Sequence, residues 1–302
     1  MRTMHRLGER FWDKAQEGFA REIKIFSDPS NSWIFSELDG VFDQTRPFFA
    51  QINALGGEGR YLVRYICCVD PAQEQRMNRY MELLDAIVIQ AKPEDICGLP
   101  IYSKSLPPMA GLIKALEAGY VIGRICGSVL AERCMKLMPS AIDLEMRCDP
   151  DVTLSCEQRR TLTYSDVCLA TSSILWWLMG GNLALANDLW EKRLQDISPR
   201  LQKEDRYYLL KFLVNIIQFT KNRNMKQAAV AEKALIDMQL FWLRCVSLDR
   251  TCEIHESELI MAELLFQELT EGRNLSVRDA INHLQLNYVK SRLSVSVLSR
   301  QT

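Results

Sequence analysis

The segment SSILWWLMGGNLALANDLWEKRL, Ser172 to Leu194, decides the kind of fold that this chain adopts. Two stretches of helical character flank Gly180 and Gly181. Either glycine can take the left-handed conformation that ends a helix, and Asn182 is a favoured cap for the next helix. The segment therefore predicts two helices folded back on each other. Its tryptophans belong to both helices, and at least two of them are expected to pack face to face: Trp176, Trp177 and Trp190.

Paired glycines beside aromatic residues also occur in phosphate-binding loops. Such a loop requires a glycine, four residues and then Gly-Lys-Ser/Thr, and no lysine follows Gly181 at that spacing. The stretch GGEG at 56–59 is expected to be a flexible turn and is a weak signal for nucleotide binding. We therefore expect no cofactor.

Helical periodicity dominates the rest of the chain. The segment from Asp70 to Gln90 has a capping aspartate, a proline at the first helical position and an apolar stripe. Similar stripes run through 209–217, 225–246 and 256–271. No segment shows sustained two-residue alternation, which is typical of strands. The prediction is an all-α fold, an irregular bundle of stacked antiparallel helical hairpins.

Small residues recur at a spacing of four in the helical pattern that follows residue 109. They are Ala115, Gly119, Gly123, Gly127 and Ala131. A glycine inside a helix costs about 1 kcal/mol relative to alanine, so a row of them needs a reason. The expected reason is the close approach of a second helix to this face.

The segment from Asp95 to Pro108 contains three prolines and a glycine, and it is expected to be a loop. It suggests an N-terminal helical region at 1–95, a boundary at 96–108 and a C-terminal helical region at 109–302. The alternative is one continuous domain.

Composition narrows the functional classes. Hydrophobic residues make up 48% of the 302 residues and charged residues 25%, which is ordinary for a folded globular protein. The formal net charge of −1 lacks the basic excess typical of nucleic-acid binding, so no nucleic-acid partner is expected. No uncharged run is long enough to span a bilayer, so no membrane partner is expected either. The first residues lack a signal-peptide pattern, and the ten cysteines are interpreted as reduced thiols of a cytoplasmic protein.

Residues capable of catalysis are sparse. The chain has three histidines and no Gly-x-Ser-x-Gly nucleophile motif. Cys245, Cys252 and His255 lie close in sequence and could be three metal ligands, but their spacing matches no usual zinc arrangement. We expect no metal site and no enzymatic activity. A cysteine-dependent enzyme, with Cys97 or Cys126 as nucleophile and His255 or His283 as base, is the weaker alternative.

One connector between two expected helices is rich in acidic residues. The sequence DRTCEIHESE carries Asp249, Glu253, Glu256 and Glu258, and we expect it to be exposed. Two compatible interpretations follow. Glu256 and Glu258 can favour the start of the following helix through its dipole, and the four carboxylates can form an acidic patch that meets a basic partner.

The stretch LTYSDVCLATSSILWWLMGGN resembles a core segment of helical immunity proteins from bacterial polymorphic toxin systems, the group called immunity protein 49. The late stretch ELIMAELLFQELTEG is similar to a helix of that group, with Ala262, Glu268 and Gly272 at matching positions. The resemblance covers Tyr164 to the C-terminus, and MAGLIKALEAG shows a weaker similarity to the same group.

The resemblance implies a protein that binds a cognate toxin or effector stoichiometrically and neutralises it without catalysis. It carries no residue-level binding motif. A helical adaptor or secretion-associated scaffold is the alternative, and the sequence leaves the oligomeric state open.

Overall fold

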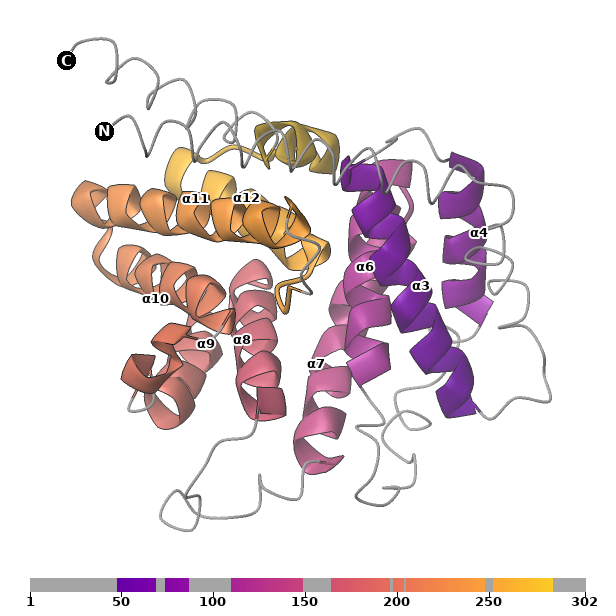
Figure 1. Cartoon of the computed structure of the whole chain (residues 1–302), viewed down its shortest axis with the longest axis horizontal. Coiled ribbons are helices and arrows are strands. Elements are labelled where there is room, and N and C mark those ends of the chain that lie inside the picture. The colour runs from indigo at the N-terminus through magenta and orange to yellow at the C-terminus, as the bar shows by residue number, and fades with distance from the viewer. Residues whose placement is uncertain are drawn as a thin grey trace. The chain divides into compact units, whose positions relative to one another are not determined.

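The computed structural model describes residues 48–68, 74–86, 110–148, 164–195, 198–203, 205–247 and 252–284. These residues form helices and short connections, and no strand occurs among them (Figure 1). The predicted all-α fold is confirmed. Within the same ranges, no helix combines the length and the apolar character that crossing a bilayer requires.

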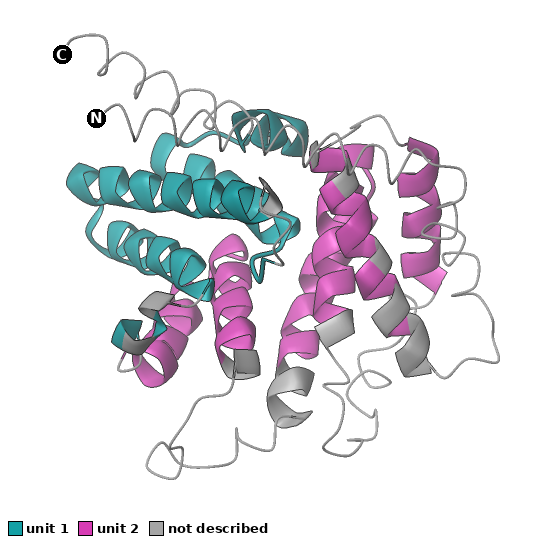
Figure 2. Ribbon diagram, viewed as in Figure 1, with its two compact units in different colours: residues 1–31, 196–302 teal, residues 32–195 magenta. Residues whose placement is uncertain are grey.

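The chain divides into two compact units, residues 32–195 and residues 1–31 with 196–302 (Figure 2). The segment 96–108, where a boundary was predicted, lies outside the described residues. Helices on both sides of it belong to the same unit, and the division between units follows Gln195.

In the unit of residues 32–195, helix α6 (Ala110–Cys126) packs against three other helices. They are α3 (Phe48–Cys68), α4 (Glu74–Leu84) and α7 (Leu130–Cys148). The predicted stripe of α4 is buried through Met77, Tyr80, Met81 and Leu84. The Tyr80 hydroxyl lies 3.2 Å from the carbonyl oxygens of Leu55 in α3 and Ala115 in α6. One side chain of α4 thus connects three helices.

Glycines set how closely these helices approach. A Cβ at Gly119 would lie 2.2 Å from Leu84 Cδ2, and one at Gly123 would lie 3.1 Å from Ala131 Cβ. The predicted close approach along this face is therefore confirmed. The small residues do not share one helix, however, because Gly127 has φ +65° and separates α6 from α7.

The expectation of a turn at GGEG was wrong, because α3 continues through residues 56–59. The local glycine signal is overridden by packing, since Gly59 lies where α4 and α6 meet α3. A Cβ there would lie 2.3 Å from Tyr80 Oη and 2.6 Å from Ala118 Cβ.

The helical hairpin at the GGN sequence is confirmed. Helix α8 (Tyr164–Met179) is followed by a turn in which Gly181 has φ +72°. The amide of Asn182 donates to the Trp177 carbonyl at 2.7 Å, and that of Gly181 donates to Leu178 at 3.0 Å, which is a Schellman motif. The Asn182 side chain then caps α9 (Leu183–Leu189) by accepting from Leu185 N–H at 3.2 Å. The π-helical turn η4 (Trp190–Leu194) follows.

The aromatic packing around this hairpin differs from the prediction. Trp176 is buried at 3% exposure, and its ring meets Tyr120 of α6 edge to face at 5.5 Å. Trp177 and Trp190 are only half-buried. The predicted face-to-face pair is replaced by this contact between α8 and α6, because Trp176 lies on the buried side of α8.

The other unit contains the 3₁₀ turn η5 (Ser198–Lys203), α10 (Arg206–Asn222), α11 (Met225–Ser247), α12 (Glu256–Phe266), the π-helical turn η6 (Gln267–Glu271) and a helix at 277–284. The predicted stripes are buried in α10 and α11. Gly272 ends η6 with φ +64°. The Ser276 hydroxyl accepts from Asp279 N–H at 3.1 Å and so caps the helix at 277–284.

We predict opposite effects for two glycine substitutions in α3. Gly57→Ala should raise the free energy of unfolding by about 0.5–1 kcal/mol, because a helical alanine costs less entropy and no atom lies within 4 Å of the new Cβ. Gly59→Ala should lower it by about 1–3 kcal/mol, because the new Cβ would overlap Tyr80 and Ala118. Urea denaturation of both variants checks this, and equal effects would contradict the packing described for α3.

We also predict that the two adjacent tryptophans contribute unequally to stability. Trp176→Ala should cost about 3–5 kcal/mol, because it leaves a cavity beside Tyr120. Trp177→Ala should cost clearly less, because that side chain is partly solvated. Chemical denaturation of the two variants measures the difference, and a larger loss at Trp177 would show that the helix is rotated from its position here.

Candidate functional site

Helix α12, where two of the predicted partner-binding residues lie, is buried on all sides. Every residue from Glu256 to Phe266 is buried, including Glu256 at 3%, Glu258 at 0% and Glu263 at 1% exposure. The expected acidic patch on the surface was therefore wrong for Glu256 and Glu258. The physical reason is that each carboxylate has a partner from a neighbouring helix.

A buried ion pair joins α12 to α10. Arg206 Nη1 donates to Glu258 Oε1 at 2.5 Å, and the two side chains are 4% and 0% exposed. Glu258 Oε2 accepts from the backbone N–H of His255, the residue that caps α12, at 2.9 Å. The carboxylate thus binds both the guanidinium and the start of its own helix. Its position in the first turn agrees with the helix-dipole interpretation.

The other predicted acidic residues are dispersed. Glu256 Oε1 accepts from the indole Nε1 of Trp242 in α11 at 3.1 Å, inside the core. Glu253 is half-buried in the connector. Asp249 lies outside the described residues. The described members of the set therefore do not form an exposed acidic surface.

A third carboxylate, missed by the sequence analysis, lies further along α12. Glu263 accepts from Gln239 Nε2 of α11 at 2.9 Å and from Gln267 Nε2 at 3.2 Å. His283 Nδ1 lies 3.2 Å from the same carboxylate. These contacts attach α12 to α11 and to the helix at 277–284.

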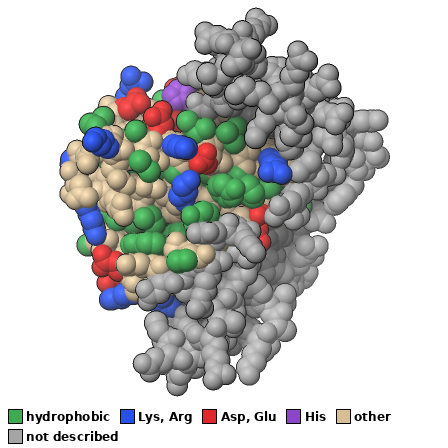
Figure 3. Space-filling view, turned by 60° about the vertical axis from the view of Figure 1, so that its left-hand side comes forward, with side chains coloured by type: hydrophobic (Ala, Val, Ile, Leu, Met, Phe, Trp, Pro, Cys, Tyr) green, Lys and Arg blue, Asp and Glu red, His purple; other side chains and the backbone are tan. Residues whose placement is uncertain are grey.

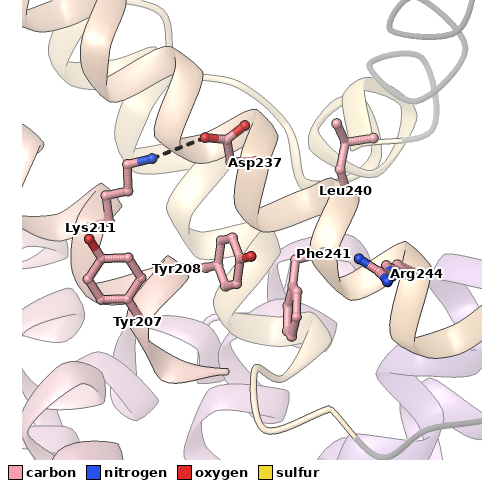
Figure 4. A pocket seen from close by; sticks show the side chains of 7 residues that line it. All are labelled: Tyr207, Tyr208, Lys211, Asp237, Leu240, Phe241 and Arg244. Carbon is pink, nitrogen blue, oxygen red and sulfur yellow. Dashed lines mark hydrogen bonds and ion pairs between the residues drawn. The ribbon is translucent and has the colours of Figure 1, made fainter. Parts of the chain in front are cut away.

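A concave feature among the described residues of this unit lies between α10 and α11 (Figure 4). Its volume is about 470 Å³. Three of its lining residues come from α10 and four from α11: Tyr207, Tyr208, Lys211, Asp237, Leu240, Phe241 and Arg244. We call it the α10–α11 groove.

Stacked aromatic rings form the floor of the α10–α11 groove. The rings of Tyr208 and Phe241 are 4.3 Å apart and inclined by 17°, and Tyr207 meets Tyr208 edge to face at 6.4 Å. On one side of the rings Lys211 Nζ binds Asp237 Oδ2 at 3.1 Å, and on the other lies the exposed Arg244 (Figure 4). The groove thus offers a flat apolar surface between charged groups.

The exposed charges of the α10–α11 hairpin are mainly basic. Exposed basic side chains outnumber exposed acidic ones among its described residues: Lys221, Arg223, Lys226, Lys233 and Arg244 against Glu232. On the face drawn in Figure 3, described hydrophobic side chains lie next to such charged groups. The hairpin therefore carries the opposite charge to the patch predicted from the connector.

None of the six cysteines whose side chains are described is in a disulfide. Burial raises the pKa of Cys134 to about 12, so this thiol is protonated at neutral pH and is a poor nucleophile. Cys126 is exposed at the end of α6, and Cys97 lies outside the described residues. The two histidines considered as the base of a cysteine-dependent enzyme lie in different environments. His255 is buried at 7% exposure, and His283 is half-buried beside Glu263.

Three buried side chains that do not line the α10–α11 groove have the residue types that can hold a metal ion. Asp205, Cys245 and Cys252 are buried, and their ligand atoms all lie within 4.8 Å of one another. Burial raises the pKa of Cys252, and the neighbouring Cys245 and Asp205 add to this effect. The sequence analysis paired the two cysteines with His255, but the third member is Asp205, which is distant in sequence.

Comparison with known protein families, with curated proteins and with solved structures finds no match. The sequence analysis did not find the α10–α11 groove. A signal was present, because Tyr207 and Tyr208 precede the buried stripe of α10 and Phe241 lies between two positions of the α11 stripe. That pattern does not reveal that the aromatic residues of the two helices meet.

We predict that the buried ion pair is strongly coupled. Arg206→Met should lower the free energy of unfolding by about 3–5 kcal/mol, because it leaves the Glu258 carboxylate buried without its cation. The double variant Arg206→Met/Glu258→Gln should lose less than the sum of the two single losses. A double-mutant cycle by chemical denaturation measures the coupling, and additive losses would show that the pair is not formed.

Proposed function

We propose that this protein acts by binding, and that it neutralises a cognate toxin or effector protein that docks in the α10–α11 groove. The observation that carries the proposal is the stacked Tyr208–Phe241 floor with charged groups on both sides. The narrower immunity role is supported by the resemblance of Tyr164 to the C-terminus to helical immunity proteins, and the α10–α11 groove lies within that part of the chain. Such a protein would act in the cytoplasm of the cell that it protects.

The residue types of the α10–α11 groove favour a protein partner. Tyrosine, phenylalanine and arginine are enriched at the centres of protein interfaces, where rigid rings bury much area with little loss of side-chain entropy. Tyr208 and Phe241 are already stacked, so docking would not need to order them. The Lys211–Asp237 pair offers both a donor and an acceptor at the edge.

The charge of the hairpin indicates the chemistry of the partner. Its exposed basic residues favour a partner segment that carries carboxylates around an apolar or aromatic side chain. Arg244 can present guanidinium N–H groups to such a carboxylate beside the Phe241 ring. A protein partner is favoured over nucleic acid, because the whole chain has a net charge of −1.

The test compares two charge reversals on α11. Arg244→Glu changes the α10–α11 groove, whereas Lys233→Glu changes an exposed residue of the same helix that does not line it. Tagged wild-type protein is purified from its native cells, and the polypeptide that co-purifies at equal stoichiometry is identified. That polypeptide is then expressed alone and with each variant.

The expected result is growth arrest by the partner alone and protection by wild type and Lys233→Glu. Arg244→Glu should weaken binding by about 30-fold or more, the effect typical of an interface hot spot, and should fail to protect. A partner that is not toxic would contradict the immunity role. Equal protection by both variants would show that the partner binds outside the α10–α11 groove. Nucleic acid in the purified complex would favour a nucleic-acid partner over a protein partner.

A further inference from the structure

We propose that Asp205, Cys245 and Cys252 form a binding site for a thiophilic divalent metal ion, with Zn²⁺ as the expected ligand. Asp205 directly precedes α10, Cys245 lies in the last turns of α11, and Cys252 lies in the connector that leads to α12. The site would therefore join three segments that are up to 47 residues apart in sequence, as the positions 205 and 252 show.

The geometry suits a tetrahedral ion. The two sulfur atoms and a carboxylate oxygen lie within 4.8 Å of one another. Zinc–sulfur bonds of about 2.3 Å and zinc–oxygen bonds of about 2.0–2.2 Å place tetrahedral ligand atoms roughly 3.4–3.8 Å apart. The observed separations are therefore close to those that a bound zinc ion requires.

The Asp205 side chain does not cap α10. An aspartate directly before a helix commonly accepts a hydrogen bond from the first turn, but the Asp205 side chain makes no such bond to α10. It is instead buried at 4% exposure beside the two sulfur atoms. A carboxylate and two thiols in one buried group are ligands that zinc accepts.

The ligand types also select among metals. Thiolate ligands favour zinc and other thiophilic ions over magnesium and calcium, which prefer oxygen. Binding displaces one proton from each thiol, so the two thiolates and the carboxylate carry three negative charges against two on the ion. Three protein ligands leave one coordination position for water or another group.

The site would stabilise the part of the unit that carries the α10–α11 groove. Tyr207 lies two residues after Asp205, and Arg244 directly precedes Cys245. Metal binding would therefore fix the ends of α10 and α11 where these residues lie. The proposal stands independently of the partner, because metal binding is measured on the chain alone.

The test uses the full chain, reduced, treated with a chelator and dialysed. Addition of Co²⁺ should give the visible and near-ultraviolet absorption of a tetrahedral cobalt–thiolate complex at one ion per chain, and Zn²⁺ should abolish it. Cys245→Ser and Cys252→Ser should lose the spectrum, and Asp205→Asn should weaken binding at least 10-fold. Cys126→Ser, which changes an exposed cysteine of α6, should keep the spectrum.

A second measurement is independent of whether the cysteine variants fold. Zn²⁺ added to the chelator-treated wild type and to Cys126→Ser should raise the Tm, whereas Mg²⁺ should not. The proposal is overturned if wild type gives no cobalt–thiolate spectrum or if the spectrum survives in folded Cys245→Ser. It is also overturned if Zn²⁺ leaves the Tm of the reduced wild type unchanged.

Discussion

The ion pair between Arg206 and Glu258 joins α10 to α12 inside the unit that contains residues 196–302. A carboxylate with 0% exposure loses its hydration, and that loss is offset only if a cation and further donors replace the water. Arg206 and the His255 N–H supply them. Because Arg206 is the first residue of α10 and Glu258 is in the first turn of α12, the pair fixes the starts of two helices against each other.

The two units achieve close helix packing in different ways. Around α6, glycines remove side-chain volume, so α3, α4 and α7 approach it closely. The Tyr80 hydroxyl of α4 lies within hydrogen-bond distance of backbone carbonyls in α3 and α6. Around α12, the buried carboxylates of Glu258, Glu256 and Glu263 each require a donor at a defined position. Apolar contacts tolerate sliding, whereas hydrogen bonds to a buried charge do not, so the second arrangement fixes the register of α10, α11 and α12.

The surface that we propose for binding depends on this buried framework. Tyr207 and Tyr208 follow Arg206 directly, so the ion pair also positions the aromatic residues that α10 contributes to the α10–α11 groove. Asp205 precedes it and is placed beside the two cysteines. On α11, Phe241 and Trp242 are adjacent, one lining the groove and the other donating to Glu256 in the core. A few residues thus connect the interior of the unit to its exposed face.

The sequence by itself determined the helical class and many helix boundaries, because these depend on nearby residues. Gly181 and Asn182 end one helix and begin the next, and the stripe of α10 follows from its period. Tertiary structure decided which charges are buried. Glu256 and Glu258 appear exposed in sequence, since their partners Trp242 and Arg206 lie 14 and 52 residues away. The GGEG stretch is helical because distant helices pack on it. Local pattern fixes backbone conformation, but burial of a charge or a glycine depends on contacts that form only when distant segments meet.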